Sequence, residues 1–198
     1  EELVARGLIA QVTNEEEIKG MINAGKATFY IGFDPTADSL HVGHFMALSL
    51  MKRLQLAGNK PIALLGGGTG MIGDPKPDAE RVLSTREEVK ARVEKIKAQV
   101  QNFFASEEVT FVDNYNWLQD LRLIDFLRDI GKHFTVNELV KKDAIAKRLN
   151  SEVGLSYTEF AYPLLQAFDY LELYRRHNCT LQVGGSDQWG NIVAGVEL

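Results

Sequence analysis

The chain has 198 residues, of which 45% are hydrophobic, and its formal net charge is −5 at pH 7. This size predicts one globular domain with a full core and leaves little room for two. The acidic balance excludes a strongly basic protein that coats nucleic acid without regard to sequence, although a local basic patch can still hold an RNA. The single cysteine, Cys179, excludes an intrachain disulfide and a cysteine-cluster zinc site, and it fits a reducing compartment.

No apolar run approaches the roughly 18 residues that a membrane helix needs. The acidic start of the chain does not resemble a signal peptide, so we expect a cytoplasmic protein without a membrane partner. The chain begins with Glu1 and ends at Leu198, inside a predicted helix that starts near Asp187. We therefore expect that part of a longer parent protein is missing.

The first third of the chain predicts a nucleotide-binding turn. Glu1 to Lys26 is expected to form two short helices, the second capped by Asn14. Phe29 to Phe33 is an apolar strand that Pro35 ends, and Val42 to Leu56 carries apolar residues at helical spacing. Such a strand-to-helix junction is a common place for a nucleotide.

His41 and His44 open this last helix and share one face of its first turn. Unpaired backbone N–H groups and the positive end of the helix dipole attract phosphate there. The alternative is that His41 only caps the helix and His44 is a surface imidazole. Because the glycine-rich dinucleotide fingerprint is absent from this turn, we expect ATP rather than a nicotinamide or flavin dinucleotide.

A second apolar strand, Pro61 to Leu65, leads into five glycines within eight residues, Gly66 to Gly73. These glycines predict either a backbone that approaches a ligand closely or a flexible loop. Asp74 and Pro75 directly after them favour the first interpretation. The polar stretch from Lys76 to Arg81 is expected to be a mobile surface loop.

The middle of the chain reads as scaffold. Ser84 to Glu87 predicts a capping box for a helix with a core-facing stripe formed by Val89, Val93, Ile96, Val100 and Phe103. A third strand at Val109 to Val112 and a helix at Leu121 to Ile130 follow. Thr135 caps the next helix. We expect this helix to have a solvated basic face, formed by Lys141, Lys142, Lys147 and Arg148.

The helix capped by Ser156 is expected to reach Arg176, and three of its polar residues, Tyr162, Gln166 and Asp169, share one face. Because their neighbours are apolar, this face predicts a binding cavity; the alternative is the wet side of a surface helix. Thr180 to Val183 is a fourth strand, followed by a glycine turn and Asp187, which can bind a ribose hydroxyl.

Alternating strands and helices predict an α/β fold, a parallel sheet flanked by helices, with ligands at the carboxyl ends of the strands. Three segments, 32–44, 66–75 and 183–191, together with the Tyr162, Gln166 and Asp169 helix, resemble the bacterial tyrosyl-tRNA synthetases over nearly the whole chain. The resemblance implies a Rossmann-like class I catalytic domain at residues 1–198, with a helical connecting insertion at about 115–150.

The resemblance also implies an activity and its partners. L-tyrosine and ATP would give tyrosyl-adenylate and pyrophosphate, and the tyrosyl group would pass to the 3′ end of tRNA(Tyr). Mg²⁺ would arrive with ATP and would not be held by a protein cage. A homodimer is implied, with its contact at residues 115–149, and no DNA partner. Apolar residues expected in this contact are Leu121, Ile124, Phe126, Leu127 and Phe134, unless they complete the monomer core.

Each matching residue carries an implied role. Tyr30 and Asp169 correspond to the pair that hydrogen-bonds the phenol of tyrosine. The residues expected around its ammonium group are Asp74, Tyr162 and Gln166. The adenylate site is expected to be lined by Gly32, Asp34, Gly185, Asp187 and Gln188, with Asp187 on the ribose and Gln188 near the substrate carboxyl. The expected catalytic residues are Thr36 and His41 at the γ-phosphate, His44 at the nucleotide and Arg81 at the pyrophosphate.

The chain also departs from the family pattern. The lysine-rich second signature and the tRNA-binding parts lie beyond Leu198, so we expect this chain alone to be weakly active or inactive. Residues 76–81 form a loop about one residue shorter than usual, and Ile31 and Ala47 stand where the family often has small or hydroxyl side chains. Three alternatives remain, namely tryptophanyl-tRNA synthetase, another nucleotidyltransferase of the same fold, and a regulatory module derived from a synthetase. The Tyr30 and Asp169 pair discriminates against the first.

Overall fold

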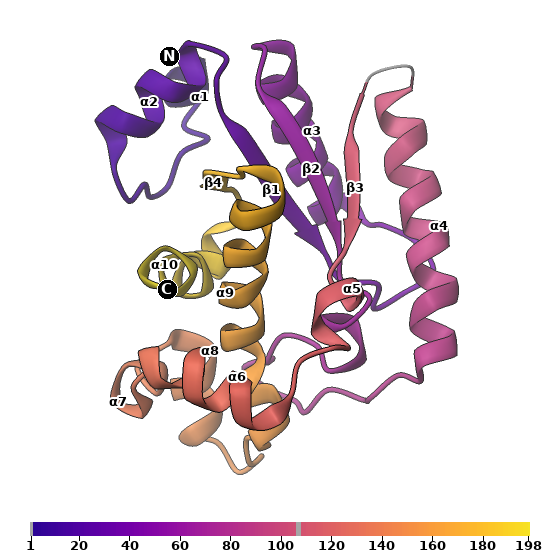
Figure 1. The fold of residues 1–198 in the computed structure, drawn as a ribbon, viewed down its shortest axis with the longest axis vertical. Helices are drawn as coiled ribbons and strands as arrows, with labels where there is room; N and C mark the ends of the chain where they lie inside the picture. Colours follow the sequence, from indigo (N-terminus) through magenta and orange to yellow (C-terminus); the bar gives the residue numbers. More distant parts are fainter. Residues whose placement is uncertain (1, 106–107) are drawn as a thin grey trace.

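The computed structural model describes residues 2–105 and 108–198. Its centre is a sheet of four parallel strands in the order β3-β2-β1-β4 (Figure 1). The strands are β1 (Thr28–Phe33), β2 (Lys60–Leu65), β3 (Thr110–Asp113) and β4 (Leu181–Gln182). The expected α/β fold with a parallel sheet is confirmed.

The connections between strands run in different directions on the two sides of β1. Helices α3 (Val42–Leu56) and α4 (Arg86–Phe104) connect β1 to β2 and β2 to β3, whereas β4 pairs with the opposite side of β1. The order therefore reverses between β1 and β4. In open α/β sheets, ligands bind outside the carboxyl ends of the strands at such a reversal.

Apolar side chains bury both faces of the sheet. On one face, Phe29, Ile31 and Phe33 of β1 pack in a cluster with residues of α3 and α4. On the other face, Tyr30 and Leu64 pack with residues of α9 (Tyr157–His177). Each large side chain buried in this way contributes about 1.5–3 kcal/mol. The sheet is thus a firm platform for the loops at its edge.

The remaining elements are short. The helices are α1 (Glu2–Ala5), α2 (Glu15–Asn23), α5 (Tyr115–Leu118), α6 (Leu123–Asp129), α7 (Val136–Leu139), α8 (Asp143–Leu149) and α10 (Trp189–Glu197), and the 3₁₀ turns are Thr69–Met71, Gly131–His133 and Ser186–Gln188. Asn14 caps α2 as expected, accepting from the Glu17 amide at 3.3 Å. Figure 1 shows α6, α7 and α8 gathered around the N-terminal half of α9, away from the N-terminus of the chain.

The N-cap of α4 and the last residue of its core-facing stripe each differ from the prediction by one residue. Thr85, not Ser84, is the N-cap, and it forms a reciprocal capping box with Glu88. The Ser84 hydroxyl instead accepts from Arg92 at 2.9 Å. At the far end Phe104 is buried and Phe103 is only half-buried. Phe104, four residues after Val100, faces the core more directly than Phe103, which is three residues after it.

The predicted basic face was wrong for two of its four residues. The expected single helix is broken into α7 and α8, so the lysines and the arginine no longer share one side. Lys141 and Lys147 are exposed, but Lys142 is half-buried and its ammonium donates to the Gly190 carbonyl. Arg148 is completely buried, at 0% exposure. A charge pattern alone cannot show which cation has a buried partner.

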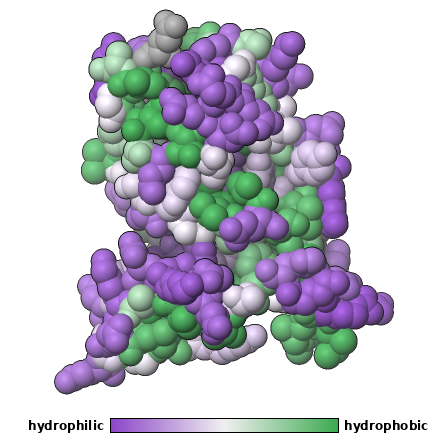
Figure 2. Space-filling model, turned by 90° about the vertical axis from the view of Figure 1, so that its left-hand side faces the viewer, coloured by the Kyte–Doolittle hydropathy of each residue, from purple (hydrophilic) through white to green (hydrophobic). Residues whose placement is uncertain are grey.

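Apolar patches on the molecular surface alternate with polar side chains on the side shown in Figure 2. Within residues 2–105 and 108–198, no helix is long and apolar enough to span a bilayer.

Candidate active site

The glycine-rich segment after β2 is shaped by close side-chain approaches. A Cβ atom built on Gly66 would lie 1.9 Å from Asp34 Oδ1, and one built on Gly67 would lie 2.2 Å from Asp113 Oδ1. Gly73 has a φ of +84°, which other residues rarely adopt. The glycines therefore let carboxylates of neighbouring strands sit against the backbone, which argues against a flexible loop. The close approach to a ligand stays a prediction.

Asp169 of α9 and Tyr30 of β1 lie at one end of a buried cluster of polar side chains. Asp169 is 2% exposed, and the Tyr30 side chain is 1% exposed. No hydrogen-bond partner lies within reach of the Tyr30 hydroxyl in the described part of the chain. Burial raises the pKa of Tyr30 well above its ordinary value, and the charge of Asp169 raises it further. A buried hydroxyl without a partner, next to a carboxylate, is suited to receive a hydroxyl-bearing ligand.

Two residues that the sequence analysis missed hold the Asp169 carboxylate. Asn114 Nδ2 donates to Asp169 Oδ2 at 2.8 Å, and Trp117 Nε1 donates to Oδ1 at 2.8 Å. Burial raises the Asp169 pKa to about 8, although these two hydrogen bonds lower it. The available signal was the polar pair Asp113 and Asn114 directly after the third predicted strand, at the edge where ligands bind.

Asp34 lies in the middle of the same cluster of polar side chains. Thr69 Oγ1 donates to its Oδ1 at 2.7 Å, and the Tyr162 hydroxyl donates to its Oδ2 at 2.7 Å. Burial raises the Asp34 pKa, the two hydrogen bonds lower it, and the nearby Asp74 raises it. Because Asn114 Nδ2 also donates to Thr69 Oγ1 at 2.9 Å, one continuous network runs from Asp34 to the carboxylate at the buried end.

Asp74 lies at the other end of this polar cluster, where it contacts the start of α10. Gln188 Nε2 donates to Asp74 Oδ2 at 2.9 Å, and Asn191 Nδ2 donates to Oδ1 at 3.3 Å and to Gln166 Oε1 at 3.0 Å. Burial raises the Asp74 pKa, and the charge of Arg81 lowers it. The structure thus brings the expected ammonium-binding residues together, and it adds Asn191 to them.

The two histidines combine both interpretations of their motif. His41 is the N-cap of α3 and its Nδ1 accepts from the Gly43 amide at 3.1 Å, while His44 Nδ1 accepts from the His41 amide at 3.2 Å. The ring centroids are 4.0 Å apart. Burial and the neighbouring ring lower the His44 pKa. With both Nδ1 atoms used as acceptors, each neutral ring carries its proton on Nε2 and can donate it away from the helix.

The other predicted site residues lie at the rim. Gly32 is exposed at the end of β1, and Gly185 and Asp187 are exposed in the turn before α10. Thr36 is exposed, and its amide donates to the Asp34 carbonyl at 2.9 Å. Among the described residues, no hydrogen bond joins the side chains of Thr36 or the two histidines to the acidic network.

Arg81 folds back toward the polar cluster from the 76–81 loop. Its Nε donates to the Asp74 carbonyl at 2.7 Å, and its amide donates to Glu159 Oε1 at 3.1 Å. By contrast, Ile31 and Ala47, which replace family residues expected near the ribose, pack in the apolar cluster of α3 and α4. These two positions therefore offer a nucleotide no polar contact.

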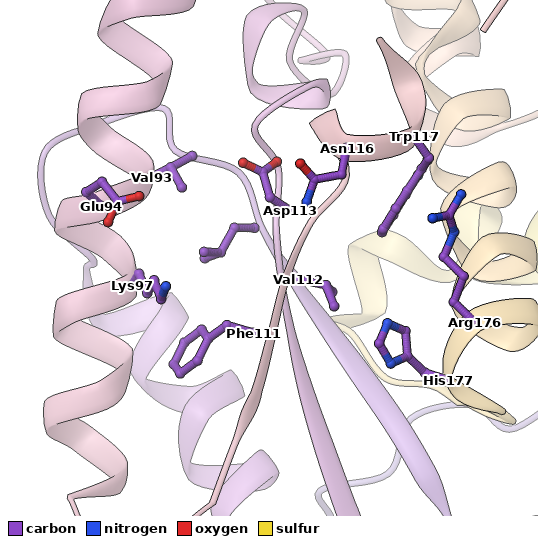
Figure 3. A pocket seen from close by; sticks show the side chains of 11 residues that line it. Val93, Glu94, Lys97, Phe111, Val112, Asp113, Asn116, Trp117, Arg176 and His177 are labelled. Atoms are coloured by element: carbon purple, nitrogen blue, oxygen red, sulfur yellow. The ribbon is translucent and has the colours of Figure 1, made fainter. Parts of the chain in front are cut away.

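A separate hollow of about 300 Å³ lies beside the edge strand β3, between α4 and the C-terminal end of α9 (Figure 3). Lys97, Arg176 and His177 are among its lining residues, and none of the predicted site residues is. Trp117 stands between this hollow and Asp169. In the described part of the chain, no cluster of three or more histidine, cysteine, aspartate or glutamate side chains is placed to hold a metal ion.

The parallel sheet, with polar side chains gathered at the carboxyl ends of its strands, defines a Rossmann-like α/β protein. The family model described as tRNA synthetases class I (W and Y) matches residues 23–198, and the chain belongs to this family. Particular relatives confirm the expected resemblance to the bacterial tyrosyl-tRNA synthetases. The chain is 54% identical to a tyrosine–tRNA ligase of Streptomyces griseus and 54% identical to tyrosine–tRNA ligase 2 of Enterococcus faecalis, in each case over 100% of its own length.

The chain spans 48% of the length of both relatives. Among solved structures, it resembles a C-terminally truncated mitochondrial tyrosyl-tRNA synthetase of Coccidioides posadasii with a TM-score of 0.82 and 30% identity. That alignment covers 98% of this chain and 56% of the other. The solved structure therefore supports the fold.

Proposed function

We propose that this chain provides the amino-acid-activating part of a tyrosine–tRNA ligase. The observation that carries the proposal is the buried Tyr30 hydroxyl without a partner beside the Asp169 carboxylate. A phenol placed there would donate to the carboxylate and accept from Tyr30, so a tyrosine side chain satisfies both groups. The names of the relatives favour tyrosine over tryptophan as well.

The opposite end of the polar cluster suits the ammonium group of an amino acid. Asp74 and Asp34 are carboxylates in a half-buried, acidic environment, and Gln166 adds an acceptor oxygen. A cation between them would stabilise their charged forms against the burial that raises both pKa values. The substrate would then lie with its phenol at Asp169 and its carboxylate near Gln188.

ATP is the proposed second substrate, accompanied by Mg²⁺. A carboxylate oxygen of tyrosine would attack the α-phosphorus in line, a new O–P bond would form, and the P–O bond to pyrophosphate would break. This step requires no general acid or base from the protein, only positioning and charge stabilisation. We assign the stabilisation to the His41 and His44 Nε2–H groups, Thr36 and Arg81, and the ribose to Asp187.

The same proposal includes three further parts, namely transfer of the tyrosyl group to tRNA(Tyr), a cytoplasmic location and a continuation of the catalytic domain outside these residues.

The test of the proposed function is calorimetry of tyrosine, tryptophan and phenylalanine with the full-length protein, followed by tyrosine-dependent release of pyrophosphate from ATP. Of the three amino acids, we expect only tyrosine to bind in the micromolar range. We also expect adenylate to form only when tyrosine is present. Preference for tryptophan, or pyrophosphate release that does not depend on an amino acid, would contradict the proposal.

The Asp169 pKa of about 8 gives a pH prediction for tyrosine binding. Below that pH the Asp169 carboxyl group of the free protein is protonated. The phenol hydroxyl of tyrosine, however, needs an ionised carboxylate to accept its hydrogen bond. Tyrosine affinity should therefore rise with pH, by up to about tenfold per unit, and level off above pH 8. Calorimetry in buffers of different ionisation enthalpy should show a proton released on binding.

Phenylalanine is the control for this titration, because it shares the ammonium group and lacks the hydroxyl. The pH dependence of its affinity should reflect the ionisation of other acidic groups, such as Asp34 and Asp74, and should lack the rise assigned to Asp169. Asp169→Asn should abolish this difference in pH dependence between the two ligands. Parallel pH profiles for both ligands in the unaltered protein would show that Asp169 does not receive the phenol.

A homodimer through residues 115–149 is a further part of the proposal. Of the five apolar residues expected there, Leu121, Phe126 and Phe134 pack against the second apolar cluster and so help to complete the monomer core. Ile124 is 70% exposed and Leu127 is 42% exposed. The same helix, α6, contributes Leu123 and Phe126 to a groove of about 310 Å³ with a largely apolar lining. A second copy would cover this face.

Ile124→Glu should shift the protein from dimer to monomer, because a second copy would have to bury a charge on each side of the two-fold axis. Sedimentation velocity at tens of micromolar measures the change. Val4→Glu, at a residue that is 63% exposed on α1, is the matched control and should leave the dimer intact. A monomer in the unaltered protein, or a dimer that survives Ile124→Glu, would contradict this interface.

A further inference from the structure

A buried ion pair lies outside the polar cluster, at the base of the 76–81 loop. Arg148 of α8 and Glu159 of α9 are 0% and 1% exposed, and Arg148 Nη2 lies 3.0 Å from Glu159 Oε2. None of the roles assigned to the site involves this pair. Burial of two charges needs an explanation, because the loss of hydration often exceeds the attraction between them.

The hydrogen bonds of Arg148 join three separate segments. Its Nη1 donates to the Lys76 carbonyl at 3.1 Å and to the Ala79 carbonyl at 2.5 Å. Its Nη2 donates to the Gly154 carbonyl at 2.5 Å as well as to Glu159. A planar guanidinium can hold several acceptors at once in fixed directions, which a lysine ammonium on a flexible stem cannot. The loop expected to be mobile is thus tied at two of its carbonyls.

Glu159 connects this cluster to Arg81. While Oε2 faces Arg148, Oε1 accepts from the Arg81 amide at 3.1 Å. The Arg81 side chain then reaches the Asp74 carbonyl, and its charge lowers the pKa of both Asp34 and Asp74. Arg81 is therefore held at two points near the acidic side chains. Its backbone amide contacts Glu159, and its guanidinium contacts the Asp74 carbonyl.

We propose that Arg148 and Glu159 are positioning residues that place Arg81 toward the pyrophosphate end of ATP. The inference rests on the proposed function, since it assigns a geometric cause to the placement of one of its residues. Two apolar residues of similar volume would fill the same space and stabilise the fold at least as well. They would not hold the Lys76 and Ala79 carbonyls or the Arg81 amide, which is what the ion pair adds.

The test is a double-mutant cycle of Arg148→Lys and Arg81→Ala in the full-length protein. Arg148→Lys keeps the charge opposite Glu159 and gives up the simultaneous hold on several carbonyls. We expect the rate of tyrosyl-adenylate formation to fall about 10- to 100-fold, with tyrosine affinity unchanged within about twofold. In the Arg81→Ala background, Arg148→Lys should lower the rate by less than about twofold more, because coupled residues are not additive.

Hydrogen exchange of the 76–81 segment gives a readout that does not depend on activity. Arg148→Lys and Glu159→Gln should each speed this exchange about tenfold or more, and exchange in the β1 and β2 strands should stay unchanged. Arg6→Lys, at an exposed arginine paired with Glu2 of α1, is the matched control and should change neither rate nor exchange. If Arg148→Lys fails to fold, Glu159→Gln carries both measurements, since it removes the charge opposite Arg148 and keeps the size of the side chain.

The outcomes separate this inference from the proposed function. If the unaltered protein forms no tyrosyl-adenylate, the proposed function fails, and the exchange experiment alone decides whether the ion pair holds the loop. If adenylate forms but the effects of Arg148→Lys and Arg81→Ala multiply, Arg148 does not act through Arg81 and the inference is wrong. Equal losses of tyrosine affinity and activation rate would show a general structural role and would also overturn it.

Discussion

Replacing Asp169 by alanine is expected to weaken tyrosine binding by roughly 1.5 to 3 kcal/mol or more, which is about a 10- to 150-fold loss of affinity. The substrate hydroxyl would lose a charge-assisted hydrogen bond inside a pocket where water cannot replace it. Phenylalanine never makes this bond, so its affinity should weaken far less, or improve slightly as the pocket loses a carboxylate. Calorimetry with both ligands measures the difference.

The comparison between the two ligands separates recognition from damage to the pocket. Asp169→Ala also leaves the Asn114 and Trp117 donors without their acceptor, so some loss of stability is expected. Asp169→Asn retains the shape and one acceptor oxygen and should be the milder variant. If either substitution lowers the affinity for tyrosine and phenylalanine equally while the protein stays folded, Asp169 has a structural role and the placement of the phenol is wrong.

Replacing Asn114 by alanine should have the largest effect on stability. Asn114 is 0% exposed, donates to Thr69 and Asp169, and accepts from the Gly68 amide at 2.8 Å. Its loss would leave an amide donor and a carboxylate short of buried partners, at about 3 kcal/mol or more. For a chain of this size that corresponds to a fall in Tm of roughly 6 to 12 °C, measurable by calorimetric or circular-dichroism melting.

Asn116 provides a matched control on the same short helix. It is exposed, and Asn116→Ala should shift Tm by no more than about 2 °C. Because Asn114 also orients Asp169, Asn114→Ala should reduce the preference for tyrosine over phenylalanine in whatever fraction stays folded. A variant with unchanged Tm and unchanged preference would show that the network from Asp34 to Asp169 does not depend on Asn114.

The candidate site was predictable where its residues stand next to one another in the sequence. His41 and His44 share the first turn of α3, and Tyr162, Gln166 and Asp169 share α9. In each group the spacing alone places the side chains on one face of the helix. Asn114 was missed because its partner Asp169 is 55 positions away and its strand is short. Trp117 was missed for the same reason, with 52 positions between the two side chains.

The same limit explains the error at Arg148. In the sequence it stands among lysines, and a run of cations usually lies on a solvated face. Its partners Lys76 and Ala79 are 72 and 69 positions away, on a loop that carries no pattern of its own. The local rule was therefore correct for Lys141 and Lys147, and wrong for the one cation that the fold surrounds.

The sequence by itself determined the alternation of strands and helices, the parallel sheet and most helix caps, because these depend on apolar periodicity and on hydrogen bonds between residues three or four positions apart. It also placed the histidine turn and the polar face of α9. Only the tertiary structure decided which carboxylates share one polar cluster, that the Tyr30 hydroxyl is left without a partner, and that Arg148 and Glu159 are buried. Those properties depend on burial and on contacts between distant segments, and both arise only when the sheet and its helices have packed together.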